Sequence, residues 1–346
     1  KLARQFLDSV QENYGIWSTL ESGAHKSDDS PLVCCTVQTL VNRLKSDHIN
    51  SFDFNLLIID EGHRSLSPTH QAIAKEFEHA RIAGFTATPR RSDQRDLMEF
   101  FETKAIDIPL DRLIREGFLC KLIIKNIPIH IRIESKSKSG DFSEEEAAHA
   151  IEPYLESIAD AMVEESKGKC GLVFLPLIST SKLLTVLLKE RGIKAAHVDG
   201  TMDDEEIEDR ILDLKMGRID VLNSSMLLSE GVDIRPVDLI LILRPTKSWT
   251  LYTQLVGRGT RTYDPDKNGL DGAKWGLKES CTILDPLWLC DEHSLLQRPA
   301  TLMSSSDEEA EEIDAKMKEG GGMLDLLEAK NAVQADRAEK LAERLK

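Results

Sequence analysis

Four consecutive apolar residues, from Leu56 to Ile59, run directly into the two acids Asp60 and Glu61. An apolar run without polar alternation is typical of a strand that is buried on both faces of a parallel sheet. The two carboxylates then lie at the carboxyl end of the strand, where open α/β sheets bind ligands. Asp60 is suited to hold a nucleotide-bound Mg²⁺, and Glu61 is suited to polarise an attacking water. A buried strand that ends in a solvated acidic turn is the alternative, and this pair alone does not separate the two.

The sequence around these acids alternates between predicted strands and predicted helices over residues 1–105. Strands are expected at 32–37, at 56–59 and within 81–89, where Pro89 stops the strand; helices are expected at 2–11 and 67–79, and a loop at 14–30. This rhythm is typical of βαβ units, so the first domain is predicted to contain a parallel sheet.

Small polar side chains follow two of these strands. Thr36, Gln38 and Thr39 stand where the first strand gives way to a helix. They either cap that helix or present hydroxyl and amide groups to a phosphate backbone, and capping is the simpler interpretation. Thr86 and Thr88 stand at the end of another strand. Hydroxyls beside the acids could link nucleotide state to movement of a partner domain, with an ordinary strand-to-turn junction as the alternative.

The same rhythm divides the rest of the chain. It stops over 106–168, which is predicted to be an interdomain connection with its own strand and helix. It restarts over 169–290, which is predicted to form a second parallel α/β domain. Residues 291–346 contain an acidic run, three consecutive glycines and many strong helix formers. This tail is predicted to be a solvated helix, and a helix that docks or dimerises is the alternative.

The segment from Gln254 to Arg261 carries the most specific chemistry of the second domain. Gln254, Arg258 and Arg261 are four and three residues apart, so a helix would place all three on one face. Gly257 and Gly259 flank the first arginine, which suggests a close approach to phosphate. Arginine suits multidentate phosphate contacts, and arginine fingers stabilise phosphoryl transfer. A surface helix with two solvated arginines is the alternative.

A second polar segment precedes that helix. Ser225 follows a predicted strand, and Gly231 permits unusual backbone angles in the loop beyond it. Asp233 could orient the arginines or contact the ribose of a nucleotide. A simple turn is the alternative for this loop.

Taken in order, these segments resemble the motifs of superfamily 2 helicases, the DEAD/DEAH-like group with two RecA-like domains. The resemblance covers roughly residues 1 to 290, and its closest likeness is to XPB-like and RadD-like DNA helicases and to restriction-enzyme motors. Gly62 in place of Ala and the form of segment 230–233 point to that branch. The matching segments are Asp60-Glu61-Gly62-His63 for the Walker B box, Thr86-Ala87-Thr88 for the "SAT/TAT" motif, 36–40 for a nucleic-acid contact, 173–174 for the start of the second domain, 225–233 for the "T…RGxD" motif and 254–261 for the arginine-finger motif.

The resemblance implies an α/β fold of two RecA-like parallel-sheet domains, the first incomplete, plus a helical acidic C-terminal tail. It implies an ATP-dependent helicase or translocase core that acts on DNA, with ATP hydrolysed between the two domains and Mg²⁺ as the metal. By this resemblance Asp60 coordinates Mg²⁺, Glu61 activates water, and Arg258 and Arg261 stabilise the transferring phosphoryl group. Gln254 orients the γ-phosphate or the water. The remaining implied residues bind nucleotide (Gly231, Asp233) or contact nucleic acid and couple it to nucleotide state (Thr36, Gln38, Thr39, Thr86, Thr88, Ser225).

One departure from the family is large, because no Gly-rich loop ending in Gly-Lys-Ser/Thr is present. The segment 23–27 contains Gly and Lys, but it lacks a Gly before the Lys and a strand upstream. We therefore expect Lys1 to lie inside a longer natural protein. We also expect this chain to bind or hydrolyse ATP poorly or not at all, since the loop and its Lys hold the β- and γ-phosphates.

Composition restricts the partners. A formal net charge of −16 argues against nucleic-acid binding through bulk charge, although it permits a local basic groove. The six cysteines show no metal-ligand spacing, so they are interpreted as reduced thiols, and structural zinc is not expected. Neither a signal peptide nor an apolar run of the roughly 20 residues of a membrane span is seen. The expected location is cytoplasmic or nucleoid-associated, with no membrane partner and with the acidic tail as a contact for a protein.

Two rival functions stay open at this point. An RNA helicase shares the same motifs, because these contact mainly phosphates. A non-catalytic nucleic-acid-binding module is favoured by the missing loop and disfavoured by the intact Asp60, Glu61, Arg258 and Arg261.

Overall fold

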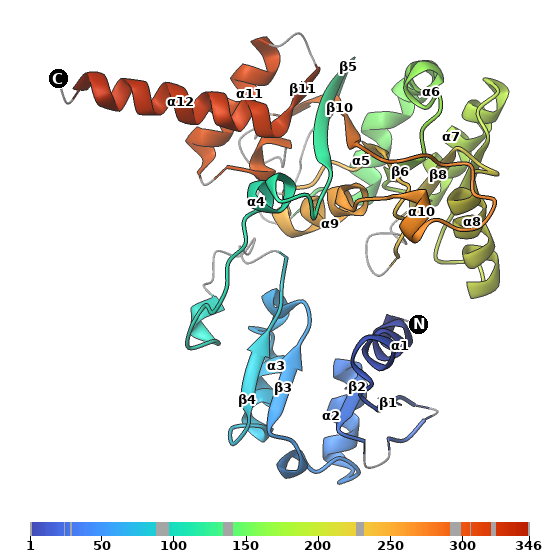
Figure 1. Cartoon of the computed structure of the whole chain (residues 1–346). Coiled ribbons are helices and arrows are strands. Elements are labelled where there is room, and N and C mark those ends of the chain that lie inside the picture. The colour runs from blue at the N-terminus through green and yellow to red at the C-terminus, as the bar shows by residue number, and fades with distance from the viewer. Residues whose placement is uncertain are drawn as a thin grey trace. The chain divides into compact units, whose positions relative to one another are not determined.

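The computed structural model describes residues 2–23, 25–27, 30–87, 97–133, 141–225, 232–290, 299–304, 306–319 and 323–344. The chain divides into two compact units, Lys1–Ile106 and Asp107–Lys346 (Figure 1). Both units contain parallel strands with helices packed on them, so the predicted α/β class is confirmed. Within the described part of the chain, no helix combines the length and the apolar character that crossing a membrane requires.

The first unit contains two pairs of parallel strands. β1 (Ser18–Glu21) pairs with β2 (Leu32–Cys35), and β3 (Leu56–Ile59) pairs with β4 (Arg81–Gly84). Its α-helices are α1 (Leu2–Tyr14), α2 (Val37–Lys45) and α3 (Pro68–Glu76). Each predicted strand and helix of this region is found, while β1 lies in a segment that was predicted to be loop.

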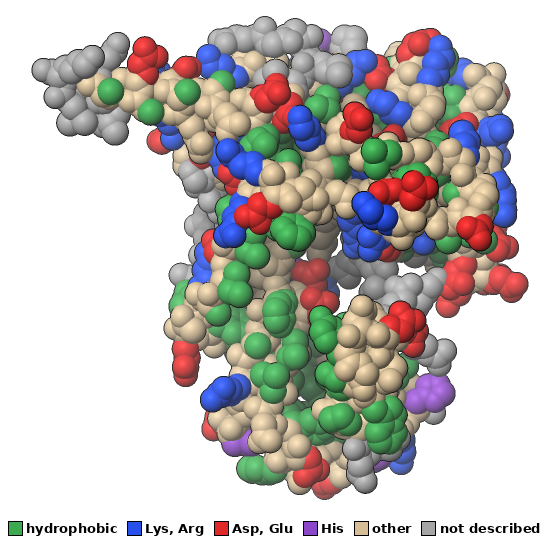
Figure 2. Space-filling model, in the orientation of Figure 1, with side chains coloured by type: hydrophobic (Ala, Val, Ile, Leu, Met, Phe, Trp, Pro, Cys, Tyr) green, Lys and Arg blue, Asp and Glu red, His purple; other side chains and the backbone are tan. Residues whose placement is uncertain are grey.

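The acidic strand β3 is covered on one face within the described residues. Leu57 packs against a small core of side chains from α2, α3 and the segments that follow them, among them Leu40 and Ile73. Leu56 and Ile58 point the other way and are 51% and 49% exposed. The prediction of burial on both faces is therefore wrong for this strand, because these helices supply apolar side chains to one face only. The side of the first unit visible in Figure 2 accordingly carries many apolar side chains.

The strand missed by sequence reasoning, β1, ends at a buried carboxylate. Glu21 is 1% exposed, and its two oxygens accept hydrogen bonds of 2.5 Å from Arg43 Nε and from the Ser27 N–H. His48 Nε2 lies 3.7 Å from the same carboxylate. Burial alone would raise the pKa of Glu21, but the bonds from Ser27 and Arg43 outweigh it and leave the pKa below its usual range. Glu21 thereby fastens β1 to the end of α2.

Replacing Arg43 with Ala is expected to destabilise the first unit by about 3 kcal/mol, because it leaves a buried charge without its main partner. The lowered pKa means that Glu21 stabilises the fold above the unfolded-chain pKa of about 4.3, and that this stabilisation is lost as pH falls through the folded value. Urea unfolding from pH 7 to pH 3, with hydrogen exchange to follow the first unit, measures both effects.

Arg112→Ala is the control for this substitution, because Arg112 makes an exposed i,i+4 pair with Glu116 and such pairs contribute little. Equal stability of Arg43→Ala and wild type at pH 7 would contradict the argument.

The second unit is built on a seven-stranded sheet with the order β11-β5-β10-β9-β6-β8-β7. Six strands are parallel, and β11 runs antiparallel to β5 at one edge. The strands are β5 (Lys121–Ile133), β6 (Gly171–Leu175), β7 (Ala195–Val198), β8 (Val221–Ser225), β9 (Leu239–Ile242), β10 (Ser280–Cys290) and β11 (Met323–Asp325).

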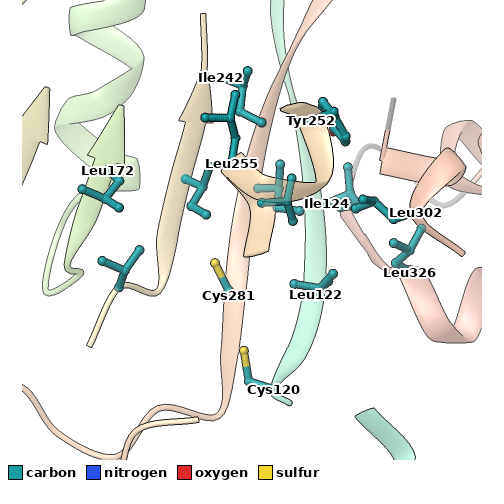
Figure 3. Packing of buried hydrophobic residues seen from close by; sticks show 14 of the residues in the cluster. Cys120, Leu122, Ile124, Leu172, Ile242, Tyr252, Leu255, Cys281, Leu302 and Leu326 are labelled. Atoms are coloured by element: carbon teal, nitrogen blue, oxygen red, sulfur yellow. The ribbon is translucent and has the colours of Figure 1, made fainter. Parts of the chain in front are cut away.

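Helices cover both faces of this sheet. One face packs against α8 (Asp204–Met216), α9 (Trp249–Thr260), α11 (Asp307–Glu319) and α12 (Leu326–Arg344). The other face packs against α5 (Glu144–Ile151), α6 (Leu155–Glu165) and α7 (Ile178–Glu190). The central strands β6, β8 and β9 are buried along their whole length, because helices cover both faces of the sheet. Figure 3 shows Leu122, Tyr252, Leu255 and Leu326 within one apolar cluster.

Two expectations about the second half of the chain need correction. The segment 106–168 was predicted to connect two domains, but β5 pairs with β10 along its length, and α5 and α6 belong to one helical layer. The tail was predicted to be solvated, yet Ile313 of α11 and Leu326 of α12 are fully buried against the sheet. Both segments are therefore parts of the second unit. Local sequence patterns do not show which distant segments pair, and for this reason both were misplaced.

Candidate functional site

The acidic turn after β3 has a strained backbone. Glu61 adopts the left-handed conformation, with φ and ψ both at 51°, and its N–H donates to Asp60 Oδ1 at 2.9 Å. A non-glycine residue in this region is uncommon, and such strain often marks a functional position. The next residue is held in place, because the Gly62 N–H donates to the Phe85 carbonyl at 2.7 Å. The turn therefore presents an exposed Asp60 and a half-exposed Glu61 from a fixed position after the strand.

His63 connects the acidic turn to the strand beside it. Its Nδ1 lies 3.1 Å from Glu61 Oε2 and 3.3 Å from Thr86 Oγ1, and the imidazole is buried. His63 belongs to the motif that follows β3, but the sequence pattern predicts no separate role for its side chain. The sequence feature that could have indicated its role is its position directly after Asp-Glu-Gly. Thr86 thus lies beside the acids, as its position at the end of β4 predicts, whereas Thr88 falls outside the described residues.

The polar group after β2 lies at the start of α2. Thr36 caps the helix, since its hydroxyl accepts the Thr39 N–H at 3.2 Å and lies 2.9 Å from the Thr39 hydroxyl. Gln38 is exposed on the first turn. Burial, and then the negative charge of Asp60, raise the pKa of Cys34 in β2. Capping is therefore observed for Thr36, and Gln38 stays accessible.

The two arginines of the second unit converge on one short segment. Arg258 Nη1 donates to the Val232 carbonyl at 2.6 Å, and Arg261 forms an ion pair with Asp233. Arg235 Nε lies 3.2 Å from the same carboxylate. Burial would raise the pKa of Asp233, but Arg261 and Arg235 outweigh it and lower the pKa. Asp233 is therefore ionised and holds two arginine side chains by ion pairs. Arg258, Arg261 and Arg235 are together called the arginine cluster.

Arg261 belongs to this cluster but lies just beyond α9, whereas its spacing predicted a position within a helix. α9 ends at Thr260, and Arg261 has an extended backbone with φ −66° and ψ 141°. It forms an isolated antiparallel bridge with Leu119 instead of continuing the helix. The prediction that Gln254, Arg258 and Arg261 share one helical face is wrong for Arg261, because the helix stops one residue too early.

The two glycines around Arg258 have different roles. A Cβ at Gly259 would lie 2.3 Å from Cys281 Sγ and 2.7 Å from Ile240 Cδ1, so this glycine lets α9 pack directly on the sheet. A Cβ at Gly257 would meet nothing within 4 Å. The interpretation that both glycines serve approach to phosphate is therefore replaced by a packing role at Gly259.

Two other predicted site residues of the second unit, Gln254 and Ser225, have buried polar groups. Gln254 Nε2 is buried and has no hydrogen-bond partner within the described part of the chain. A buried donor without a partner costs about 1–3 kcal/mol, and this amide can still donate a hydrogen bond to a ligand. Ser225 ends β8 and is 8% exposed. Gly231 lies outside the described residues.

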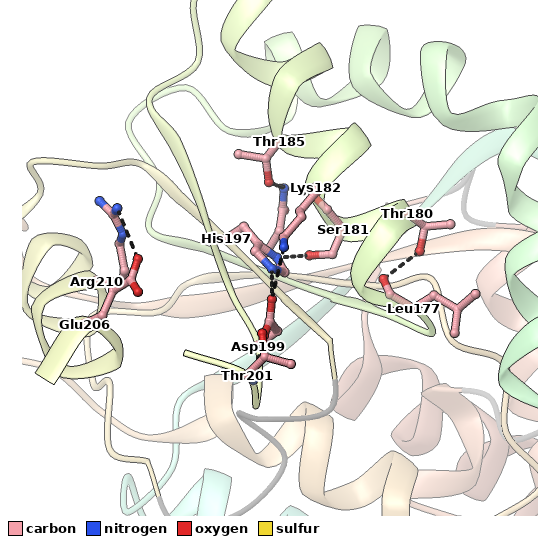
Figure 4. A network of polar contacts seen from close by, with 11 residues as sticks. Leu177, Thr180, Ser181, Lys182, Thr185, His197, Asp199, Thr201, Glu206 and Arg210 are labelled. Atoms are coloured by element: carbon pink, nitrogen blue, oxygen red, sulfur yellow. Dashed lines mark hydrogen bonds and ion pairs between the residues drawn. The ribbon is translucent and has the colours of Figure 1, made fainter. Parts of the chain in front are cut away.

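A Ser–His–Asp network in the second unit is structural. His197 Nδ1 lies 2.6 Å from Ser181 Oγ, and His197 Nε2 lies 2.6 Å from Asp199 Oδ2 (Figure 4). The hydroxyl of Thr201 and the imidazole hold the pKa of Asp199 well below its usual range. Ser181 and Asp199 are fully buried, so no substrate reaches this serine. The network joins α7 to the end of β7.

The candidate metal ligands of this site are the carboxylates of Asp60 and Glu61. Throughout the residues that the structure describes, no group of three or more His, Cys, Asp or Glu side chains could hold a metal ion. Asp60 and Glu61 still fit Mg²⁺ delivered with a nucleotide, because that ion uses one or two carboxylates together with phosphates and water.

Two segments of the chain match models of known protein families. Residues 2–91 match the family model for the res subunit of type III restriction enzymes, and residues 153–263 match the helicase conserved C-terminal domain. IRC3 of Saccharomyces cerevisiae, which is named as an ATP-dependent helicase, is 29% identical over 287 residues, covering 77% of this chain and 39% of the relative. The irc3 protein of Schizosaccharomyces pombe is 28% identical over 280 residues, covering 78% and 44%. The chain thus spans less than half the length of these curated relatives.

Solved structures show the same fold. A fragment assigned as the HsdR subunit of a type I restriction enzyme from Vibrio vulnificus has a TM-score of 0.58 at 21% identity, covering 78% of this chain and 50% of that one. The Dbp5 protein of S. cerevisiae, solved with RNA and ADP BeF3, has a TM-score of 0.51 at 16% identity, covering 84% and 69%. Two segments of the chain thus resemble domains of helicases and of restriction-enzyme motors.

Proposed function

We propose that this chain is most of the motor core of an ATP-dependent helicase or translocase that acts on DNA. The observation that carries the proposal is that each unit contains part of the expected catalytic set, here called a half-site: an acidic turn in the first unit and an arginine cluster in the second. Asp60 and Glu61 form the first half-site, and Gln254, Arg258 and Arg261 form the second. A nucleotide-binding domain that no longer hydrolysed ATP would not need both the acidic turn and the arginines.

Each half-site has a defined task in the proposed reaction. Glu61 accepts a hydrogen bond from the attacking water and orients it toward the γ-phosphate. Arg258 and Arg261 stabilise the charge that spreads over the transferring phosphoryl group, and the Gln254 amide donates to the γ-phosphate or to the water. Mg²⁺ held at Asp60 would neutralise phosphate charge. Gly231 and Asp233 support the nucleotide side of the arginine cluster.

The nucleic-acid side of the proposal uses polar residues at strand ends. Thr36, Gln38, Thr39 and Ser225 contact the phosphate backbone of one strand. Thr86 and Thr88 relay the state of the nucleotide, and the contact of His63 with both Glu61 and Thr86 offers a physical path for that relay. We propose DNA and not RNA as the substrate because residues 2–91 match the model for the res subunit of type III restriction enzymes.

ATP hydrolysis by the protein expressed from its complete reading frame tests this proposal. Turnover is measured alone, with single-stranded DNA and with RNA of the same sequence. We expect stimulation of at least about 10-fold by DNA and less by RNA. Greater stimulation by RNA would reassign the substrate, and nucleic-acid binding without hydrolysis would support a non-catalytic binding module.

The 346-residue chain itself is expected to hydrolyse ATP slowly or not at all, because its sequence contains no Gly-Lys-Ser/Thr loop to hold the β- and γ-phosphates. Measuring the chain beside the complete protein in the same assay checks this expectation. Equal turnover by both would mean that other residues supply the phosphate cradle.

A further inference from the structure

A buried lysine lies behind the arginine cluster, at the end of α9. The last carbonyls of a helix have no partner within the helix and need other donors. Lys278 Nζ donates to the carbonyls of Gly259 and Arg261, at 2.7 Å in each case. The carbonyl between them, that of Thr260, accepts the Cys120 N–H at 2.8 Å. The carbonyls of Gly259, Thr260 and Arg261, at the end of α9 and just beyond it, therefore all accept hydrogen bonds, and one ammonium group donates to two of these three carbonyls.

The same ammonium group also reaches the segment that carries Asp233. Lys278 Nζ lies 3.4 Å from the Arg235 carbonyl, two residues beyond Asp233. The backbone of Lys278 is itself anchored, since its N–H donates to the Tyr263 carbonyl at 3.0 Å. Lys278 thus joins the helix that supplies Arg258 to the segment on which both arginines converge.

Burying the Lys278 ammonium costs desolvation free energy, which its hydrogen-bond partners must offset. Lys278 is 7% exposed, and a buried ammonium loses most of its hydration. Carbonyl oxygens at the negative end of a helix compensate for that loss. An apolar side chain would fill the space without the desolvation cost, but it would leave the carbonyls of Gly259 and Arg261 without their donor.

We propose that Lys278 is a positioning residue for the arginine cluster, and that it fixes Arg258 and Arg261 in the geometry that phosphoryl transfer requires. This inference rests on the proposed ATPase function. Small displacements of catalytic groups can cost about 100-fold in rate. Lys278 touches no substrate, so its removal lowers the rate of the chemical step and leaves ATP binding almost unchanged.

The test is a double-mutant cycle in the DNA-stimulated ATPase of the protein from its complete reading frame. Lys278→Met is expected to lower kcat about 10-fold or more, with KM for ATP within about 3-fold of wild type. Arg261→Ala is expected to lower kcat further. In the Arg261→Ala background, Lys278→Met should lower kcat by a smaller factor than it does in wild type, because one of the two arginines that it positions is gone.

Controls separate positioning from folding. Lys274→Met removes another lysine of the second unit, whose ammonium pairs with Asp220 at 2.5 Å, and should leave kcat unchanged. Lys278→Gln is neutral and still donates hydrogen bonds, so it replaces Lys278→Met if that variant does not fold. It is expected to lower kcat and to show the same coupling to Arg261.

The outcomes distinguish this inference from the proposed function. If Arg261→Ala retains full turnover, the proposed role of the arginine fails, and the inference fails with it. If Arg261→Ala loses turnover while the Lys278 variants keep it, only the role of Lys278 is overturned. Losses that multiply in the double variant would show that Lys278 stabilises the unit without positioning Arg261.

Discussion

Glu61→Gln is expected to reduce DNA-stimulated ATP turnover at least about 100-fold, because general bases that orient an attacking group contribute about 10²–10⁴-fold in rate. The amide keeps the size of the carboxylate but carries no charge and accepts a proton poorly. The left-handed backbone at this position, with φ 51°, holds either side chain in the same place. KM for ATP should change little, since Glu61 acts on water and not on the bound phosphates. Steady-state kinetics with saturating single-stranded DNA measure both parameters.

The matched control for this substitution is Glu76→Gln, at the exposed end of α3 in the same unit. It should leave turnover unchanged. A Glu61→Gln variant that retains more than about a tenth of the wild-type rate would remove Glu61 from the role of base and would leave Asp60 as the functional member of the acidic pair.

Gly259→Val is expected to destabilise the second unit by about 3 kcal/mol or more, and Gly259→Ala by about 1–3 kcal/mol, because both overpack the contact of α9 with the sheet. A Cβ at this position would lie 2.3 Å from Cys281 Sγ and 2.7 Å from Ile240 Cδ1. Both neighbours are fully buried in the core, so neither side chain has space to withdraw. α9 must therefore move away from the sheet, and Arg258 must move with it. Urea unfolding of the second unit and ATP turnover should both decline.

Gly257→Ala is the internal control, since it places the same methyl group two residues away, where nothing lies within 4 Å. Alanine in a helix is favoured over glycine by about 0.5–1 kcal/mol, so this variant should be slightly more stable than wild type. Opposite signs for the two Gly→Ala variants would establish that Gly259 serves packing. Destabilisation of similar size at both positions would contradict this reading.

Sequence patterns predicted the local elements of this chain well. The apolar run before Asp60, the Thr36 cap and the alternation of strands with helices all appear in the structure. Each of these features depends on residues that are close in the sequence. The motif resemblance also pointed to helicases and restriction motors, because its segments occur in a fixed order, and residues 153–263 and 2–91 match models of these two kinds.

Features that depend on distant residues were missed. β1 is only four residues long, and its pairing with β2 and the burial of Glu21 fix it as a strand. β5 was taken for a connection because its partner, β10, lies far along the chain. The end of α9 was placed too late, since the donors that cap it come from Cys120 and Lys278. Spacing within a segment carries no information about such partners.

The order of strands in the second unit has a consequence for synthesis of the protein. β5 is one of the first strands of this unit to leave the ribosome, but its two neighbours in the sheet, β10 and β11, are the last. Parallel pairing between distant segments is slow to form, and an open strand edge can pair with other chains. Nascent chains that stop before Asp325 therefore carry an uncovered edge along β5. Because of this sheet topology, we expect cellular chaperones to protect that edge during synthesis. We expect the edge to aggregate when translation stalls.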